Sequence, residues 1–87
     1  MNIYVGNLNY KVDENDLEDI FQDYGTVSSS RIITDKFSGK SKGFGFVTME
    51  NQDEAKKAIS ELNGAEFEDR DMIVNEAKPK KTEYNRS

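Results

Sequence analysis

Two phenylalanines and a lysine share one face of a short segment near the middle of the chain. Residues 42–49 read KGFGFVTM, and their Phe and Val content favours a β-strand. Successive strand side chains point to opposite faces, so Val47 faces a core while Lys42, Phe44 and Phe46 face away from it. Two flat apolar rings beside a positive charge suit unstacked nucleobases joined to phosphate. The segment therefore predicts a surface for single-stranded nucleic acid.

The same residues have other interpretations. A fully buried strand would place Phe44, Phe46 and Val47 in the core, and a short apolar run does not exclude this. A dinucleotide-binding loop does not fit, because the third glycine is missing and no helix follows directly. Gly43 and Gly45 present no side chain, and we expect them to let a helix pack closely beneath the strand.

Residues 42–49 resemble the first ribonucleoprotein signature of the RNA recognition motif family, basic-Gly-aromatic-Gly/Ala-aromatic-Val-x-aromatic. Only the last fixed position departs, where Met49 replaces an aromatic residue. That position faces the core, so the departure affects packing and leaves the binding face intact. Residues 3–8, IYVGNL, resemble the second signature, with Tyr4 at its aromatic position. This hexapeptide is weak evidence alone, since Tyr4 fits an ordinary strand, but it is strong when paired with the first signature.

The resemblance spans residues 2 to about 79 and implies binding of single-stranded RNA, with ssDNA as a further candidate ligand. It implies that Phe44 and Tyr4 stack on bases and that Phe46 packs on a sugar or between two nucleotides. It also implies a phosphate contact from Lys42. Contacts to base edges are implied for Arg31, Asn75 and the backbone around Ala77 and Lys78. Further candidates on the same surface are Asn2, Ile33, Lys40 and Lys80.

The chain most resembles the small stand-alone members of this family from bacteria and organelles. We expect an RNA recognition motif domain over residues 1–78, a basic C-terminal tail over residues 79–87, and a monomer. The run Lys78-Pro79-Lys80-Lys81 has the composition of a nuclear import signal. We favour a basic arm that follows RNA off the sheet.

Composition restricts the alternatives. The 87 residues include no Cys and no His, so disulfides and the usual zinc sites are excluded, and the commonest general base is missing. We expect no cofactor and no enzyme activity; the absence of His and Cys disfavours the alternative of a hydrolase on the same α+β scaffold. No signal peptide or apolar run of membrane-spanning length occurs, so we expect a cytoplasmic protein.

The net charge of −5 argues against a nucleic-acid ligand until its distribution is considered. Residues 13–25 carry six acids and no base, and residues 49–71 carry eight acids against three bases. Residues 28–48 carry four bases against Asp35 alone, and the tail is also basic. The acids fall in two predicted helices and the cations in strands, loop and tail, so we expect an electrically two-faced molecule.

Hydrophobic periodicity predicts the order β-α-β-β-α-β. Strands are expected at residues 2–6, 27–34 and 42–49 and around 72–75, and helices begin after the N-caps Asp13 and Asn51. Two right-handed crossovers then give a ferredoxin-like α+β sandwich, in which a four-stranded antiparallel sheet carries both helices on one face. The expected buried helix positions are Leu17, Ile20, Phe21, Tyr24, Ala55, Ala58, Ile59 and Leu62. The rings of Tyr4, Phe44 and Phe46 should lie flat on the opposite, open face.

Two questions stay open at this point. Phe37, in the loop 35–41, stacks on a base or folds back on its own loop, and we favour the second because single exposed hydrophobes are common. The main alternative to RNA binding is a protein-interaction module of the same fold, which would dock a partner through the sheet or an acidic helix such as the one carrying Glu18.

Overall fold

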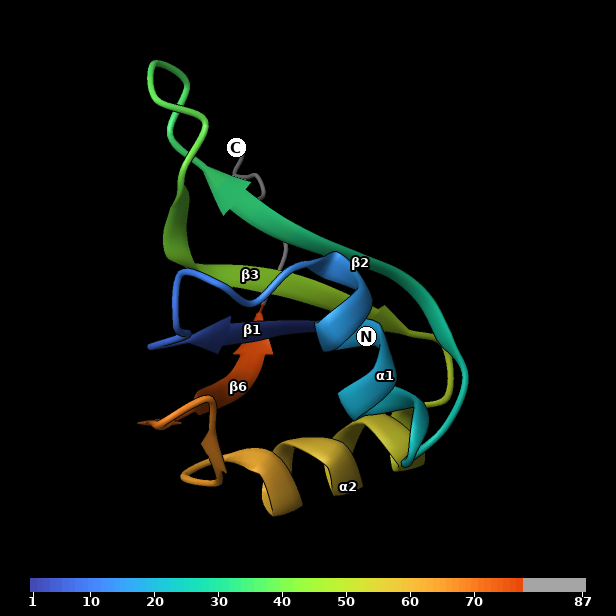
Figure 1. Cartoon of the computed structure of the whole chain (residues 1–87). Coiled ribbons are helices and arrows are strands. Elements are labelled where there is room, and N and C mark those ends of the chain that lie inside the picture. The colour runs from blue at the N-terminus through green and yellow to red at the C-terminus, as the bar shows by residue number, and fades with distance from the viewer. Residues whose placement is uncertain (78–87) are drawn as a thin grey trace, which may run out of the picture.

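A computed structural model describes residues 1–77 of the chain. Its elements are β1 (Asn2–Gly6), α1 (Glu14–Gln22), β2 (Val27–Thr34), β3 (Ser41–Met49), α2 (Gln52–Leu62), β4 (Glu66–Phe67), β5 (Arg70–Asp71) and β6 (Ile73–Ala77). The main sheet has the order β2-β3-β1-β6, and every pair in it is antiparallel. Both helices lie on the same side of this sheet (Figure 1). The predicted βαββαβ sandwich is confirmed.

Local side-chain hydrogen bonds start both helices where the sequence predicts. Asp13 caps α1, and its carboxylate accepts from the Asp16 backbone N–H while the Asp16 carboxylate accepts from the Asp13 N–H. Asn51 caps α2 by accepting from the Glu54 N–H. These bonds satisfy donors that the first helical turn leaves without partners.

A single hydrophobic core lies between the helices and the sheet. Its buried side chains come from β1, β3, β6, both helices, the β1–α1 loop and the residue between β5 and β6, and the largest include Phe21, Ile3, Leu8, Leu17, Met49 and Met72. Of the predicted helix positions, Leu17, Phe21, Ala55, Ala58 and Leu62 are buried, while Ile20, Tyr24 and Ile59 pack against the core from its edge. Met49 is fully buried, so the departure from the first signature is confirmed as a packing change.

The glycines of β3 do not serve the purpose expected of them. A Cβ atom on Gly45 would collide with the backbone carbonyl of Arg31 on the neighbouring strand β2, and would stand 3.2 Å from the Cα of Ile32. Gly43 has a φ of +85° and stands beside Leu8 and Tyr10. The expectation that both make room for a helix was therefore wrong. Gly45 admits the irregular β2 backbone, which shifts register between Ile32 and Thr34.

A small hairpin, β4–β5, precedes the last strand and was not predicted from the sequence. Its strands pair Glu66 with Asp71 and Phe67 with Arg70. The two turn residues, Glu68 and Asp69, have positive φ angles of 52° and 65°, which is the geometry of a tight hairpin turn. Phe67 packs against the core edge, as expected, and the hairpin projects Arg70 toward the loop after β1.

Across residues 1–77, neither helix has the length and apolar character needed to cross a bilayer.

Candidate nucleic-acid interface

Three aromatic rings meet on the sheet face that the helices leave open. Tyr4 on β1 is the direct cross-strand partner of Phe46 on β3. The ring centroids of Tyr4 and Phe44 are 5.9 Å apart, those of Tyr4 and Phe46 are 5.9 Å apart, and those of Phe44 and Phe46 are 6.2 Å apart. All three side chains are half-buried and none belongs to the core. The alternative of a fully buried strand is therefore wrong, and we refer to these rings as the aromatic triangle.

The rings of the triangle do not all lie flat, which corrects the expected geometry. The planes of Phe44 and Phe46 meet at 88°, those of Tyr4 and Phe46 at 65°, and those of Tyr4 and Phe44 at 34°. Edge-to-face contact between neighbouring rings is favourable because the positive ring edge meets the negative ring face. Tyr4 covers Gly6, where an added Cβ would lie 2.8 Å from two carbon atoms of its ring. Tyr4 and Phe44 are therefore tilted against each other, while Phe44 and Phe46 meet edge to face.

Residues aligned across the four strands form a row that runs through the triangle, and a polar residue lies at each end of this row. The register aligns Asn75 with Tyr4 on one side, and Arg31 with Phe46 on the other. Asn75 and Arg31 are both exposed. This places two of the predicted base-edge residues beside the rings, one on each edge strand of the sheet.

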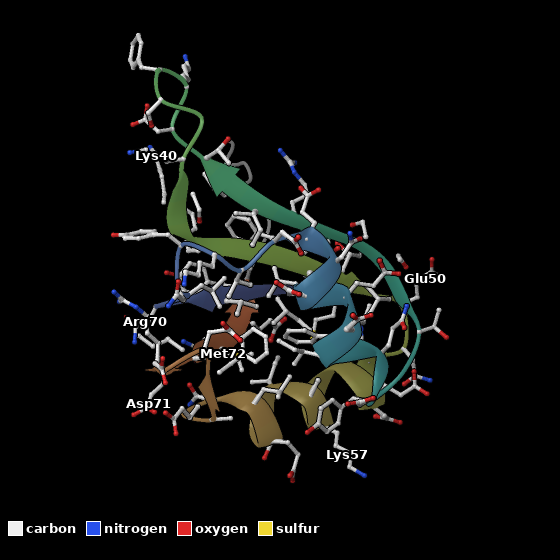
Figure 2. All side chains as sticks on the ribbon, viewed as in Figure 1. Lys40, Glu50, Lys57, Arg70, Asp71 and Met72 are labelled. Carbon is white, nitrogen blue, oxygen red and sulfur yellow. The ribbon has the colours of Figure 1, made fainter. Side chains whose placement is uncertain are left out.

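The remaining predicted residues surround this row. Asn2 lies one row further along and its side-chain oxygen accepts a 3.0 Å hydrogen bond from the Thr48 hydroxyl. Ile33, at the irregular part of β2, is partly buried but does not pack against the core as Ile32 does. Lys42 on β3 and Lys40 just before it are exposed, and Figure 2 shows Lys40 at the foot of the long β2–β3 loop. Lys78 and Lys80 lie outside the described residues, as does the basic tail.

Tyr10, in the loop between β1 and α1, was missed from the sequence. Its side chain is 66% exposed and lies beside Gly43, where an added Cβ would be 3.4 Å from the ring. The guanidinium carbon of Arg70 stands 5.7 Å from the centre of the ring, within the range of a cation–π contact. One sequence signal could have identified Tyr10: it is an aromatic residue in a polar loop shortly after the second signature. Its neighbours could not be foreseen, because the unpredicted β4–β5 hairpin supplies Arg70.

Phe37 does not fold back on its loop, so the favoured interpretation was wrong. Its side chain is 98% exposed. The Asp35 carboxylate accepts from the backbone N–H groups of Phe37, at 2.7 Å, and Ser38, at 3.1 Å. These two bonds, that of Phe37 first, lower the pKa of Asp35, while desolvation opposes them and the charge of Lys42 contributes a lesser lowering. The turn thereby holds the Phe37 side chain away from the loop.

The acidic residues of the helices lie apart from this surface. The first turns of α1 and α2 carry Glu14, Asp16, Asp53 and Glu54, where the positive end of a helix dipole favours negative charge. Both helices cover the other side of the sheet (Figure 1). These helix acids therefore lie on the side of the sheet away from the aromatic triangle.

The chain thus forms an α+β sandwich with half-buried aromatic rings on the open face of its two central strands. The RNA recognition motif family matches residues 3–73, and this chain belongs to that family. Over 80 residues the chain is 49% identical to RbpA of Synechocystis sp. (strain ATCC 27184 / PCC 6803 / Kazusa), covering 92% of this chain and 79% of that protein. It is also 49% identical over 75 residues to the 29 kDa chloroplast ribonucleoprotein of Arabidopsis thaliana. That match covers 86% of this chain but only 22% of the longer relative.

Among solved structures, the fold superposes on the crystal structure of RNA binding protein PG1. The TM-score is 0.88 and the identity 55%, over 92% of this chain and 99% of that chain.

Proposed function

We propose that this protein binds single-stranded RNA on the open sheet face, with bases stacked on Tyr4 and Phe44 and a sugar packed against Phe46. The observation that carries the proposal is the aromatic triangle, which lies on the two central strands of a member of the RNA recognition motif family, on the sheet face away from the helices (Figure 1). The Tyr4 and Phe44 rings, whose planes meet at 34°, suit two successive bases. The perpendicular Phe46 suits the sugar between them.

The residues around the triangle supply the polar contacts. Lys42 meets a phosphate, while Arg31 and Asn75 hold base edges from the two ends of the row that the register aligns. Asn2, Ile33 and Lys40 extend this contact surface, and the remaining candidates Lys78 and Lys80 lie outside the described residues. Because free aromatic faces require unstacked bases, duplex RNA is expected to bind more weakly than a single strand.

Stacking is expected to contribute more than charge. Base–aromatic stacking is worth roughly 1–3 kcal/mol per base, so the triangle supplies several kcal/mol before the strand is ordered. With about 2–4 phosphates neutralised, log affinity falls with log salt at a slope of about −1.4 to −2.8. We expect a micromolar Kd for a short oligonucleotide, with ssDNA as a weaker or equal competitor.

A titration followed by NMR tests the proposal most directly. Labelled protein is titrated with a pool of short single-stranded oligoribonucleotides, and the signals of Tyr4, Phe44 and Phe46 are followed. We expect these three residues to shift together, and Phe44→Ala to weaken binding by about tenfold or more. Lys57→Ala is the control, because Lys57 points away from the body of the molecule on α2 (Figure 2). Shifts elsewhere with the three rings silent would reject this RNA site, and the absence of any shift would favour the protein-interaction module instead.

The proposal also includes a cytoplasmic location, a monomeric protein and a binding role without catalysis. The lack of His and Cys in the whole chain supports the last of these. Light scattering of the free protein and of its RNA complex tests the monomer, since a dimer would double the measured mass.

A further inference from the structure

An open groove continues the sheet surface beyond the aromatic triangle. It has a volume of about 870 Å³, within the range of roughly 300–1,000 Å³ that small-ligand sites occupy. Its lining includes one residue of the triangle, one aromatic from the β1–α1 loop, two lysines and two polar residues of the β2–β3 loop: Phe44, Tyr10, Lys40, Lys42, Asp35 and Ser38. Because Phe44 belongs to both surfaces, an RNA strand bound on the aromatic triangle can continue directly into the groove.

The ring of Tyr10 is held in place by contacts made around it. Arg70 lies 5.7 Å from the ring centre, and its guanidinium donates to the side-chain oxygen of Asn7 at 3.3 Å. The Asn7 amide in turn donates to the backbone carbonyl of Asp71 at 2.8 Å. These contacts tie the β1–α1 loop to the β4–β5 hairpin. The ring nevertheless stays 66% exposed, so it is available to a ligand without first having to be ordered.

Asp35 gives the groove a chemical preference. Both of its recorded hydrogen bonds, from the Phe37 and Ser38 N–H groups, are accepted by Oδ1. Within residues 1–77, Oδ2 accepts no recorded hydrogen bond. A carboxylate repels phosphate but accepts hydrogen bonds from the amino group of a base, as acidic side chains do from the N4 amine of cytosine. Lys40 and Lys42, which line the same groove, are suited to the flanking phosphates.

We propose that this groove is a further nucleotide subsite, in which a base stacks on Tyr10 and donates its exocyclic amino group to Asp35. The inference rests on the RNA binding proposed above and deepens it. Cytosine, adenine and guanine each carry an exocyclic amino group that can be placed there, whereas uracil has none and presents a carbonyl oxygen where cytosine has its N4 amine. The groove therefore selects amino-bearing bases over uracil at one position of the bound strand.

A series of oligonucleotides of increasing length tests the subsite. Fluorescence anisotropy is measured with labelled oligocytidylates and oligouridylates, from dinucleotides up to about eight nucleotides. The wild-type protein is expected to gain affinity in a step once the strand is long enough to enter the groove. Tyr10→Ala is expected to remove that step, by about tenfold, and to leave the affinity of the shortest bound oligomers unchanged. Tyr10→Phe keeps the ring and is expected to keep the step.

Asp35→Asn tests the base preference. Because the two backbone N–H groups hold an oxygen at the Oδ1 position, the amide of the variant must place its NH₂ group at the Oδ2 position and offer a donor. We expect the preference for cytosine over uracil in long oligomers to disappear, with binding of short oligomers retained.

The results separate the two proposals. If no single strand binds at all, the RNA-binding proposal fails and the subsite fails with it. If short oligomers bind but Tyr10→Ala weakens all lengths equally, or weakens none, the subsite alone is overturned. An unchanged cytosine preference in Asp35→Asn overturns the role given to Asp35.

Discussion

The two faces of the central strands carry similar apolar side chains but differ in what covers them. On β1, Ile3 is fully buried under the helices, while its neighbour Tyr4 is half-buried on the open face. On β3, Val47 is fully buried and its neighbour Phe46 is half-buried. Burial of apolar area under a helix stabilises the fold. The same apolar area left open on the other face remains available to a ligand.

The faces also differ in how tightly their side chains are constrained. The covered face packs against α1 and α2 (Figure 1), and core side chains there fill space with few voids. On the open face the three rings contact one another at tilted and perpendicular angles, and both helices lie on the other side of the sheet (Figure 1). Substitutions on the first face should therefore act on folding, and substitutions on the second should act on binding.

The largest expected effect comes from substituting two neighbouring residues of β1 that lie on opposite faces of the sheet. Ile3→Ala removes buried methyl groups and leaves a cavity, which costs about 2–5 kcal/mol in the free energy of unfolding. Tyr4→Ala is expected to cost much less stability but to weaken RNA binding by about 1–3 kcal/mol. Urea denaturation measures the first quantity and anisotropy titration the second. Equal losses of stability in the two variants would contradict the division between the faces.

A smaller effect on RNA affinity is expected when a positive charge is removed from the open face, and none when it is removed from α2. Lys42→Ala, beside the triangle, removes one phosphate contact and should reduce the magnitude of the salt slope of log affinity by about 0.7. Lys57→Ala, on α2, removes the same charge from the helix-covered side and should leave the slope unchanged. Titrations at several salt concentrations measure both slopes. A similar change in the two variants would indicate that net charge, rather than position, controls binding.

Much of this fold follows from the sequence because it depends on local physics. The observed bounds of β1 and β2 agree with the predicted ranges 2–6 and 27–34, since alternation fixes which side chains a strand can bury. Asp13 and Asn51 start the helices because a short polar side chain is needed to satisfy the free N–H groups there. The convergence of Tyr4 and Phe46 follows from strand order alone.

The features that were missed depend on contacts between distant segments. The 88° angle between Phe44 and Phe46 arises from ring-to-ring packing, which spacing does not determine. The neighbour of Gly45 is the β2 backbone, because β2 is irregular at a point that no turn residue marks. Tyr10 meets Arg70 through a hairpin whose turn residues, Glu68 and Asp69, lack the glycine that usually signals such a turn.

The smallest expected effect concerns the β2–β3 loop, which belongs to neither face. The N–H groups of Phe37 and Ser38 hold the pKa of Asp35 below its usual range, so the folded loop favours the ionised carboxylate. The stabilisation is therefore present above the unfolded pKa of about 3.9 and is lost as pH falls through the lower folded value. We expect the amide signals of Phe37 and Ser38 to titrate below about pH 4, while the signals of β1 and β3 at the triangle stay unchanged. Asp35→Asn should abolish this titration. Simultaneous changes in loop and triangle would show instead that the loop and the sheet surface unfold as one unit, and that the open face owes its geometry to the loop as well as to the helices beneath it.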